Sequence, residues 1–361
     1  MSKPAAERPT SAPAPLRTSG GRFARLMNRC AWLYVAAVLI CWLALRLGGD
    51  RWWWATAMLY APRWGWALPL AILGPAAAFV RRARLPVALA ALVAAGPLMG
   101  FCFGWPSGER TRQSRGANDV RGEAIRVLTC NIGQLTYDPL ELAMLVVETE
   151  PDVITIQERM TVEELAAVVG PDWHVVGAPG ITVASRFPIA EKLVFGESEA
   201  SAWRTVAVDY RLATPGGPID FVALHLLTPR KGIEAVKDDH WRGIDRMRAN
   251  LERRSKESAA ASRWVASLPG PAIVAGDMNL PPESELFKRD WSSFADAFAA
   301  AGCGYGYTFG YTTSGWLYGI RIDHILAGAG WQVERCWVGR HIGSDHRPVV
   351  ADLRRSDGSG E

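Results

Sequence analysis

Four short apolar stretches of the chain end directly on a side chain that can bind a metal ion or transfer a proton. These side chains are Asn131 after residues 127–130, Glu158 after 153–157, His225 after 221–224 and Asp277 after 272–276. Strand ends are rigid, and the loops that leave them commonly carry function. We therefore expect these four groups to gather at one rim of a folded domain.

Four more such side chains follow towards the C-terminal end. Asn279 lies two residues after Asp277, Asp323 lies within an apolar run, and Asp345 and His346 precede the last apolar run. Carboxylate and amide oxygens together make a site that suits Mg²⁺ or Mn²⁺. Histidines at the same rim supply proton transfer and contacts to a phosphate group. The residue types alone thus favour an oxygen-rich metal site with acid–base groups beside it.

Taken one at a time, these residues also have structural explanations. Asp277 could form a turn, Asn131 could cap one, and His225 could be a satisfied core histidine. Asp323 could pair with a neighbouring arginine on a surface. His324 is expected to be structural, because alternation along a strand points it to the face opposite Asp323. Only the combined set makes the chemical interpretation strong.

Composition narrows the classes of protein and of metal site. The six cysteines include no CxxC pair and no Cys/His cluster, so neither a zinc site nor a disulfide framework is indicated. The net charge of +4 is too small to identify a nucleic-acid-binding protein by itself. With hydrophobic residues at 49%, the chain is neither collagen-like nor wholly disordered.

Residues 124–353 have the sequence pattern of one α/β domain, and residues 354–361 form a short polar tail. Helical spacing predicts helices over 139–150 and 241–268. Many short strands with few helices predict two packed β-sheets flanked by helices. The expected strands are 125–130, 153–157, 181–185, 205–210, 219–225, 272–276, 320–326, 332–338 and 348–353.

The N-terminal part has a different amino-acid composition. Residues 1–29 form an arm rich in Pro, Ala and Arg, which we expect to be disordered. Three apolar stretches, at about 30–47, 64–80 and 85–105, are each close to the length that crosses a bilayer, and we predict three transmembrane helices. Residues 106–123 are polar and predict a linker.

Tryptophan and arginine positions bear on the membrane topology. Trp52, Trp53, Trp54, Trp64 and Trp66 crowd the ends of the apolar stretches, where membrane interfaces enrich tryptophan. Arginines precede the first stretch and fill the short connection 81–84, and both would lie in the cytoplasm with the N-terminus inside. We therefore predict a multi-pass protein of the plasma or inner membrane with an extracytoplasmic C-terminal domain.

Six short motifs occur in a specific order. They are TCNIG (129–133), PDVITIQE (151–158), VALHL (222–226), GDMN (276–279), RIDHI (321–325) and SDHRP (344–348). Together they closely resemble the motifs of the endonuclease/exonuclease/phosphatase superfamily, which includes DNase I and inositol polyphosphate 5-phosphatases. The resemblance spans 124–353 and implies a DNase I-like four-layer α/β sandwich and a Mg²⁺- or Mn²⁺-dependent hydrolase of phosphate esters.

The resemblance also implies which residues bind the metal and the substrate. Glu158 resembles the main metal-binding carboxylate, and Asn131 is similar to the amide shared by the metal and phosphate regions. Asp345 resembles a second carboxylate near the metal. His225 is similar to the second histidine of the DNase-like and phosphatase-like branches, and has both catalytic and substrate-binding roles.

The remaining motif residues resemble the catalytic groups. Asp277 is similar to the aspartate that orients or deprotonates the attacking water. Asn279 resembles the amide that holds this aspartate and a phosphate oxygen. Asp323 and His346 resemble the Asp–His pair that stabilises the pentacovalent phosphate. The motifs leave open whether Asp277 or His346 is the base.

Attachment to a membrane favours a phosphate ester or pyrophosphate carried by a lipid as the substrate. The layout of membrane spans before the domain resembles that of bacterial membrane phosphoesterases connected with teicoplanin resistance. The alternative is a tethered nuclease acting on nucleic acid, for which the arginine-rich stretch 242–254 is the candidate basic face. A more remote alternative is a catalytically inactive membrane scaffold, although no motif has lost its Glu, Asp or His.

Overall fold

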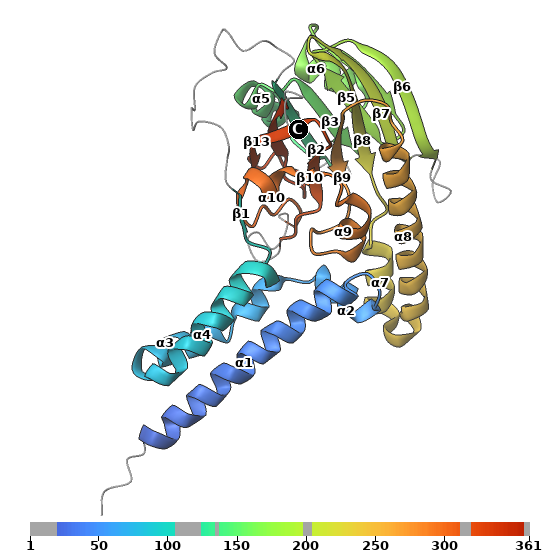
Figure 1. The fold of residues 1–361 in the computed structure, drawn as a ribbon. Helices are drawn as coiled ribbons and strands as arrows, with labels where there is room; N and C mark the ends of the chain where they lie inside the picture. The colour runs from blue at the N-terminus through green and yellow to red at the C-terminus, as the bar shows by residue number, and fades with distance from the viewer. Residues whose placement is uncertain (1–19, 105–123, 134–136, 198–203, 311–318, 357–361) are drawn as a thin grey trace, which may run out of the picture.

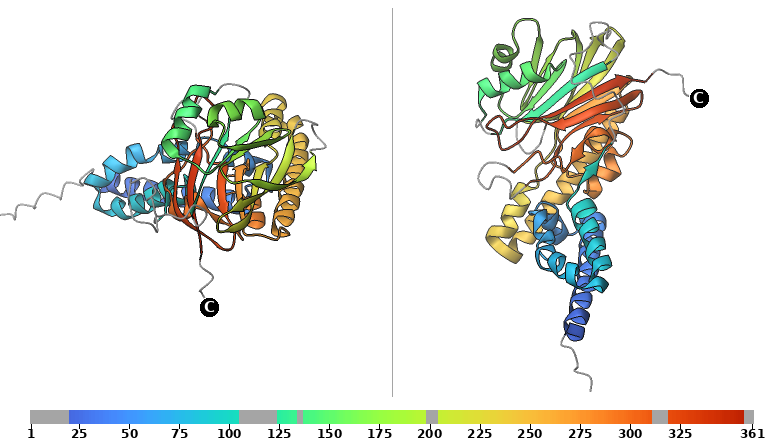
Figure 2. Two further views of the ribbon diagram at one scale, coloured as in Figure 1. Left: turned by 90° about the horizontal axis from the view of Figure 1, so that it is seen from above. Right: turned by 90° about the vertical axis from the view of Figure 1, so that its left-hand side faces the viewer.

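The computed structural model describes residues 20–104, 124–133, 137–197, 204–310 and 319–356. Two parts are visible in Figure 1: a β-sandwich with flanking helices, and a group of N-terminal helices that projects from one end of it. The views of Figure 2 show the two sheets of the sandwich face to face.

Each of the two large sheets has six strands. The first has the order β10-β12-β9-β8-β7-β6 and the second the order β13-β14-β2-β3-β5-β4. The first sheet consists of β6 (Ile189–Glu197), β7 (Thr205–Thr214), β8 (Gly217–His225), β9 (Ala272–Asp277), β10 (Ala295–Asp296) and β12 (Asp323–Ala327). The second consists of β2 (Ala124–Asn131), β3 (Val153–Gln157), β4 (His174–Ala178), β5 (Ile181–Ser185), β13 (Trp331–Val338) and β14 (Val349–Arg355).

Several helical segments pack around the two sheets of the sandwich. They are α5 (Pro139–Thr149), α6 (Val162–Val169), α7 (Arg230–Asp239), the short 3₁₀ helix η3 (His240–Gly243), α8 (Ile244–Ala266), α9 (Glu285–Trp291) and α10 (Ala297–Ala301). Local sequence explains where several begin. The Asp138 side chain accepts a bond from the Leu140 amide at the start of α5, and Thr161 and Glu164 form a capping box at the start of α6.

Three apolar clusters define the layers of the sandwich. The largest lies between the sheets and joins Val127 and Val153 of one to Phe221 and Ile273 of the other. A second cluster joins the first sheet to α8 and α9, and a third joins the second sheet to α5 and α6. The prediction of two packed sheets flanked by helices is therefore confirmed.

Strand direction explains why functional groups meet at one rim. β2 pairs in parallel with β3, and β8 pairs in parallel with β9. Each pair therefore ends at the same edge of its sheet. β12 runs antiparallel to β9 and begins at that edge, so that Asp323 is paired with Asp277. This strand begins at Asp323 rather than at the predicted residue 320, because Ile320 makes only an isolated bridge to Phe309.

The N-terminal part contains helices of unequal length. They are α1 (Gly20–Gly48), α2 (Trp53–Leu59), the 3₁₀ helix η1 (Arg63–Ala67), α3 (Leu70–Phe79), α4 (Arg81–Val93) and the π-helical turn η2 (Ala94–Leu98). An apolar cluster packs α1 against α3 and α4, and its buried members include Ala31, Val38, Ala77 and Ala90.

The prediction of three transmembrane helices is wrong. Within the described ranges, one helix, Gly21–Gly48, is long and apolar enough to cross a membrane by length and composition. In place of the second span, α3 has ten residues, which extend only about 15 Å. In place of the third, α4 begins with arginines, and the helical path ends at Leu98. A multi-pass arrangement does not follow from these helices.

Other expected boundaries also differ. α1 begins at Gly20, so the end of the predicted arm 1–29 is helical, whereas residues 1–19 lie outside the described part. Cys102 and Phe103, expected in the third span, form strand β1, which pairs with β11 (Cys303–Gly304) of the sandwich. The predicted linker 106–123 and most of the tail, 357–361, also lie outside the described residues.

Candidate active site

Asp277 lies at the centre of the polar rim. Its side chain is 2% exposed and accepts bonds from the Asn279 amide at 2.8 Å, from Asn131 Nδ2 at 3.0 Å and from Asn279 Nδ2 at 3.2 Å. Burial and then the negative charge of Asp323 raise its pKa from 3.8 to about 7, against the opposing effects of His346 and both asparagines. A carboxylate with a pKa close to the working pH is suited to accept a proton from water.

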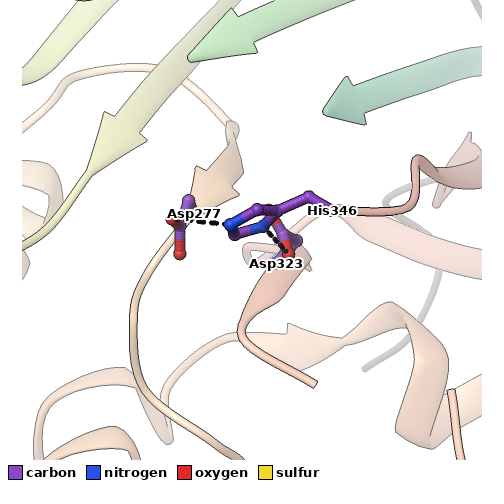
Figure 3. A group of neighbouring side chains, drawn as sticks. All are labelled: Asp277, Asp323 and His346. Carbon is purple, nitrogen blue, oxygen red and sulfur yellow. Dashed lines mark hydrogen bonds and ion pairs between the residues drawn. The ribbon is translucent and has the colours of Figure 1, made fainter. Parts of the chain in front are cut away.

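Asp323 and His346 form a buried pair beside Asp277. His346 Nδ1 lies 2.9 Å from Asp323 Oδ2, and His346 Nε2 lies 4.0 Å from Asp277 Oδ2 (Figure 3). Burial alone lowers the pKa of His346, but the charges of Asp323, Asp277 and Asp345 outweigh it and raise the pKa to about 9. The imidazole ring is therefore protonated at neutral pH, with Nε2 directed into the site.

Asn131 links the two sheets across the rim. It ends β2, and its Nδ2 donates both to Asp277 Oδ2 and, at 3.4 Å, to Glu158 Oε1. Glu158 directly follows β3 and has a positive φ of 78°, a conformation that non-glycine residues rarely adopt. This backbone turn aims its partly exposed carboxylate at the rim. The sequence-predicted Asn131, Glu158 and Asp277 are thus brought together.

His225 approaches Asp277 from the end of β8. Its Nε2 lies 3.7 Å from Asp277 Oδ2, and its buried Nδ1 has no hydrogen-bond partner in the described part of the chain. Burial and then the positive charges of Arg204 and His346 lower the pKa of His225 to about 3. The two histidines of the site therefore differ in charge at neutral pH: His346 is an imidazolium and His225 a neutral imidazole.

Asp345 lies on the loop before β14, adjacent to His346. Its partly exposed carboxylate accepts a long bond of 3.5 Å from Ser344 Oγ. Its charge reaches the site, because it helps to raise the pKa of His346. Direct contact with Glu158 is not among the contacts of the described residues.

Two supporting hydroxyl groups had no role assigned from sequence. Ser344 Oγ donates to the Asn131 carbonyl at 2.8 Å and accepts from the His346 amide at 3.0 Å, which joins the two loops. Thr308 Oγ1 accepts from the amide of Asp323 at 3.2 Å. Ser344 stands in the SDHRP motif and could have been found there, whereas residue 308 belongs to no motif.

His324, next to Asp323, points away from the site, as strand alternation predicts. Its Nε2 lies 2.9 Å from the Leu280 carbonyl and its Nδ1 lies 3.6 Å from Asp296. Arg321, a possible surface partner of Asp323 by sequence, instead pairs with Asp296 at 2.7 Å. Asp323 is thereby left to pair with His346.

One group of acidic and histidine side chains among the described residues is close enough to hold an ion. The candidate ligand atoms of Asp277, Asp323 and His346 all lie within 4.8 Å of one another. Asp323 Oδ1 is buried and has no hydrogen-bond partner within the described structure. The carboxylate oxygens of Asp277, Asp323 and Glu158 lie around the rim, and such oxygens fit a hard divalent cation.

Comparison with known proteins agrees with this architecture. The model of the Endonuclease/Exonuclease/phosphatase family matches residues 128–346, which is more than half of the chain. The chain belongs to this family. Its members hydrolyse phosphate esters and depend on divalent metal ions. No curated protein sequence matched the chain.

Solved structures that match the chain at low sequence identity include the following three. An endonuclease/exonuclease/phosphatase from Beutenbergia cavernae is 18% identical, with a TM-score of 0.47, and the match covers 65% of this chain and 72% of that one. A 3'-5' exonuclease from Neisseria meningitidis is 18% identical, with a TM-score of 0.49 and coverage of 63% and 98%. An AP endonuclease from Archaeoglobus fulgidus is 17% identical, with a TM-score of 0.48 and coverage of 63% and 98%. Family membership rests on the sequence match, not on these structures.

Proposed function

We propose that this endonuclease/exonuclease/phosphatase family member is a membrane-anchored, divalent-metal-dependent phosphoesterase whose substrate is a phosphate ester or pyrophosphate carried by a lipid. The observation that supports the chemistry best is the meeting of three groups at one rim: a carboxylate with a pKa near 7, an imidazolium held by a second carboxylate, and an oxygen-rich edge.

Asp277 is the better candidate for the base. A base must accept a proton at working pH, and the pKa of about 7 for Asp277 allows this, whereas His346 already carries its proton. Asn131 and Asn279 hold both carboxylate oxygens, so the orientation of Asp277 towards water is fixed before substrate binds. Asn279 also remains the candidate for a phosphate contact.

The two histidines have complementary roles in this proposal. His346, with its charge stabilised by Asp323, donates from Nε2 to the phosphate oxygens as negative charge develops on them. His225 is neutral and presents a hydrogen-bonding ring to the same region without adding charge. Together with Asn131 they contact the substrate phosphate.

Glu158, Asn131 and Asp345 are proposed to hold the Mg²⁺ or Mn²⁺ ion. A protonated imidazole has no free lone pair for a metal, so His346 is a poor ligand although its ring lies within the compact Asp277–Asp323 group. Glu158 is partly exposed, and among the described residues its carboxylate accepts just the long bond from Asn131, which leaves it available to a cation. When bound, the ion polarises the phosphoryl oxygen and stabilises the leaving oxygen.

The exposed side chains of the N-terminal helices support membrane anchoring by α1. Only 28% of the apolar window of α1 is buried, which distinguishes it from a core helix, and α3 and α4 also present large apolar side chains outward. These exposed residues include Leu33, Ile40, Leu47, Ile72, Phe79, Leu85 and Leu92. Water would disfavour such a surface, whereas hydrocarbon would not. α1 also packs into the apolar cluster of α3 and α4, so it is part of the folded structure of the N-terminal helices.

Arginines and tryptophans support an orientation. The arginines before Cys30 lie at the end of α1 that is distant from the sandwich, and the turn between α3 and α4, with Arg81 and Arg82, lies at the same end of the helical group (Figures 1 and 2). The positive-inside rule places that end in the cytoplasm and the sandwich outside. Nearer the sandwich, Trp52 and Trp54 are partly exposed, as expected at a membrane interface.

The position of the site supports a substrate held at the bilayer. The active-site rim is the end of the sandwich that meets the N-terminal helices (Figure 1), and Ile320 and Ile322, next to Asp323, pack into the apolar cluster of those helices. A phosphate carried on a lipid would therefore reach the rim from the membrane side.

The nuclease alternative has less support. In the arginine-rich stretch, Arg246 pairs with Asp239 and Arg248 with Asp245, and Arg254 is buried. Pairing and burial remove these charges from the basic face that nucleic acid would need. The inactive-scaffold alternative is disfavoured because all the motif side chains are present and most of them contact one another at the rim.

A substrate panel tests the proposal. The full chain in detergent or vesicles, with Mg²⁺, Mn²⁺ or EDTA, is given a polyprenyl pyrophosphate, phosphatidylinositol phosphates, sphingomyelin or plasmid DNA. We expect metal-dependent release of phosphate or of a phosphorylated head group from a lipid. Cleavage of DNA with no turnover of any lipid would replace the proposal with the nuclease alternative.

A further inference from the structure

Arg254 of α8 is almost fully buried between the sandwich and the N-terminal helices. Its side chain is 1% exposed and lies 3.3 Å from the carboxylate of Asp50, which follows α1. It also donates to the hydroxyl of Tyr60, which follows α2, at 2.5 Å. A buried arginine is stable only when its charge and its donors are matched. Two of the matching groups come from outside the sandwich.

The same arginine reaches residues 278–281, the loop that directly follows Asp277 and that we call the catalytic loop. Arg254 Nη2 donates to the backbone carbonyl of Asn279 at 2.8 Å, and the Tyr60 hydroxyl donates to the same carbonyl at 2.7 Å. Asn279 has a left-handed backbone, with φ of 51°, a conformation that asparagine adopts more readily than most residues other than glycine. In this conformation its amide and its side chain both bond to Asp277. The two donors therefore hold the turn that orients Asp277.

The loop after Asn279 is held by the same helical segment. Ser284 donates to Asp50, and Glu283 pairs at 2.8 Å with the buried Arg63 of η1. The segment 279–285 is thus held at its start by hydrogen bonds to Asp277 and further along by contacts with Asp50 and Arg63 of the N-terminal part. At the Asn279 carbonyl, the sandwich supplies Arg254 as one donor and the N-terminal segment supplies the hydroxyl of Tyr60 as the other.

We propose that Tyr60 and Asp50 of the N-terminal segment are positioning residues for hydrolysis, acting through Arg254 and the Asn279 carbonyl on Asp277. The membrane anchor is then also a structural part of the active site, and the sandwich alone has an incompletely held catalytic loop. This inference rests on the proposed hydrolase function for its kinetic test, but its structural test is independent of the substrate.

The test compares two substitutions that each remove one tyrosine hydroxyl from the full chain. Tyr60→Phe removes the bond from the Tyr60 hydroxyl to the Asn279 carbonyl and the bond that this hydroxyl accepts from Arg254, and leaves the bond from Arg254 to the carbonyl. Tyr34→Phe is the matched control, because the Tyr34 hydroxyl bonds at 2.5 Å to the Trp66 carbonyl within the helical group, away from the site. For Tyr60→Phe we expect kcat to fall about tenfold, as for the loss of about 1.4 kcal/mol of orientation, with KM little changed. Tyr34→Phe should keep the wild-type kcat.

Hydrogen exchange supplies the second readout. Amides of residues 278–281 should exchange faster in Tyr60→Phe than in wild type or Tyr34→Phe, while the central strands stay protected. A Tyr60→Phe protein that retains kcat within twofold, or whose loop exchanges at the wild-type rate, overturns the inference. A wild-type chain inactive on every substrate would contradict the proposed function instead, and the exchange experiment would still decide this one.

Discussion

Replacing His346 with alanine tests whether the positive charge of this ring stabilises the phosphate during hydrolysis. The site raises the pKa of His346 from 6.5 to about 9, so it favours the charged ring by about 3 kcal/mol. This preference is built by Asp323 at 2.9 Å and by Asp277 at 4.0 Å. If the charge is used where the phosphate gains negative charge, its removal should lower kcat by at least about 10².

The assay is metal-dependent hydrolysis of an aryl phosphodiester or phosphomonoester by the full chain, followed by release of nitrophenolate. His324→Ala is the matched control, since His324 is equally buried and neighbours Asp323, yet contacts Leu280 and Asp296 instead of the site. It should reduce thermal stability more than kcat. If folded His324→Ala protein loses activity and His346→Ala retains it, the assignment of the Asp323–His346 pair is wrong.

Four further expectations follow from the same geometry. Asp277→Ala should lower kcat by at least about 10², and its effect should not add to that of His346→Ala, because members of one site act as a unit. Glu158→Ala should raise the Mn²⁺ concentration for half-maximal activity, measured by titration; an unchanged requirement would move the ion elsewhere. Activity should fall as pH rises through about 9, where His346 loses its proton, and Asp323→Asn should move this alkaline limb to lower pH. An alkaline phosphatase reporter fused after Leu353 should be active; activity of only a cytoplasmic reporter there would reverse the orientation.

Much of the site was predictable because the ends of its strands can be recognised from the sequence pattern. Asn131, Glu158 and Asp277 each follow a run of apolar, largely β-branched residues, and the parallel pairs bring those ends together. The motif order then assigned roles that composition could not. What remained open was the choice of base, because it depends on pKa values set by burial and by neighbouring charges.

The membrane region was less predictable for a physical reason. The apolar content of a segment does not determine the length of the helix that it forms. Residues 64–80 are nearly all apolar, yet they divide into η1 and α3, with Pro69 preceding α3 and Pro75 within it. The run 85–105 similarly breaks at the π-helical turn that contains Pro97, and its end becomes strand β1. Proline removes the amide that a continuous helix requires.

The edge strand β6 was not predicted, because it mixes exposed charged and apolar residues and its alternation is weak.

Asp209 allows one more prediction, on stability, far from the residues that would hold a metal. This buried carboxylate of β7 has one oxygen, Oδ1, without a hydrogen-bond partner in the described structure. Burial first, and then the charge of Asp220, raise its pKa from 3.8 to about 7, against the attraction of Arg211. The folded chain therefore retains a proton that the unfolded chain releases between about pH 4 and pH 7, so this group makes stability fall as pH rises through that interval.

Asp209→Asn keeps the shape and removes the titration. It should stabilise the protein at pH 8 by on the order of 2 kcal/mol, and change stability little at pH 4, where the wild-type carboxyl is already neutral when folded. Thermal unfolding midpoints of both proteins at the two pH values measure this. The activity of the variant is expected to be unchanged, because Asp209 lies within the sheet rather than at the rim. A stabilisation equal at both pH values would show that the effect arises from packing and not from the raised pKa.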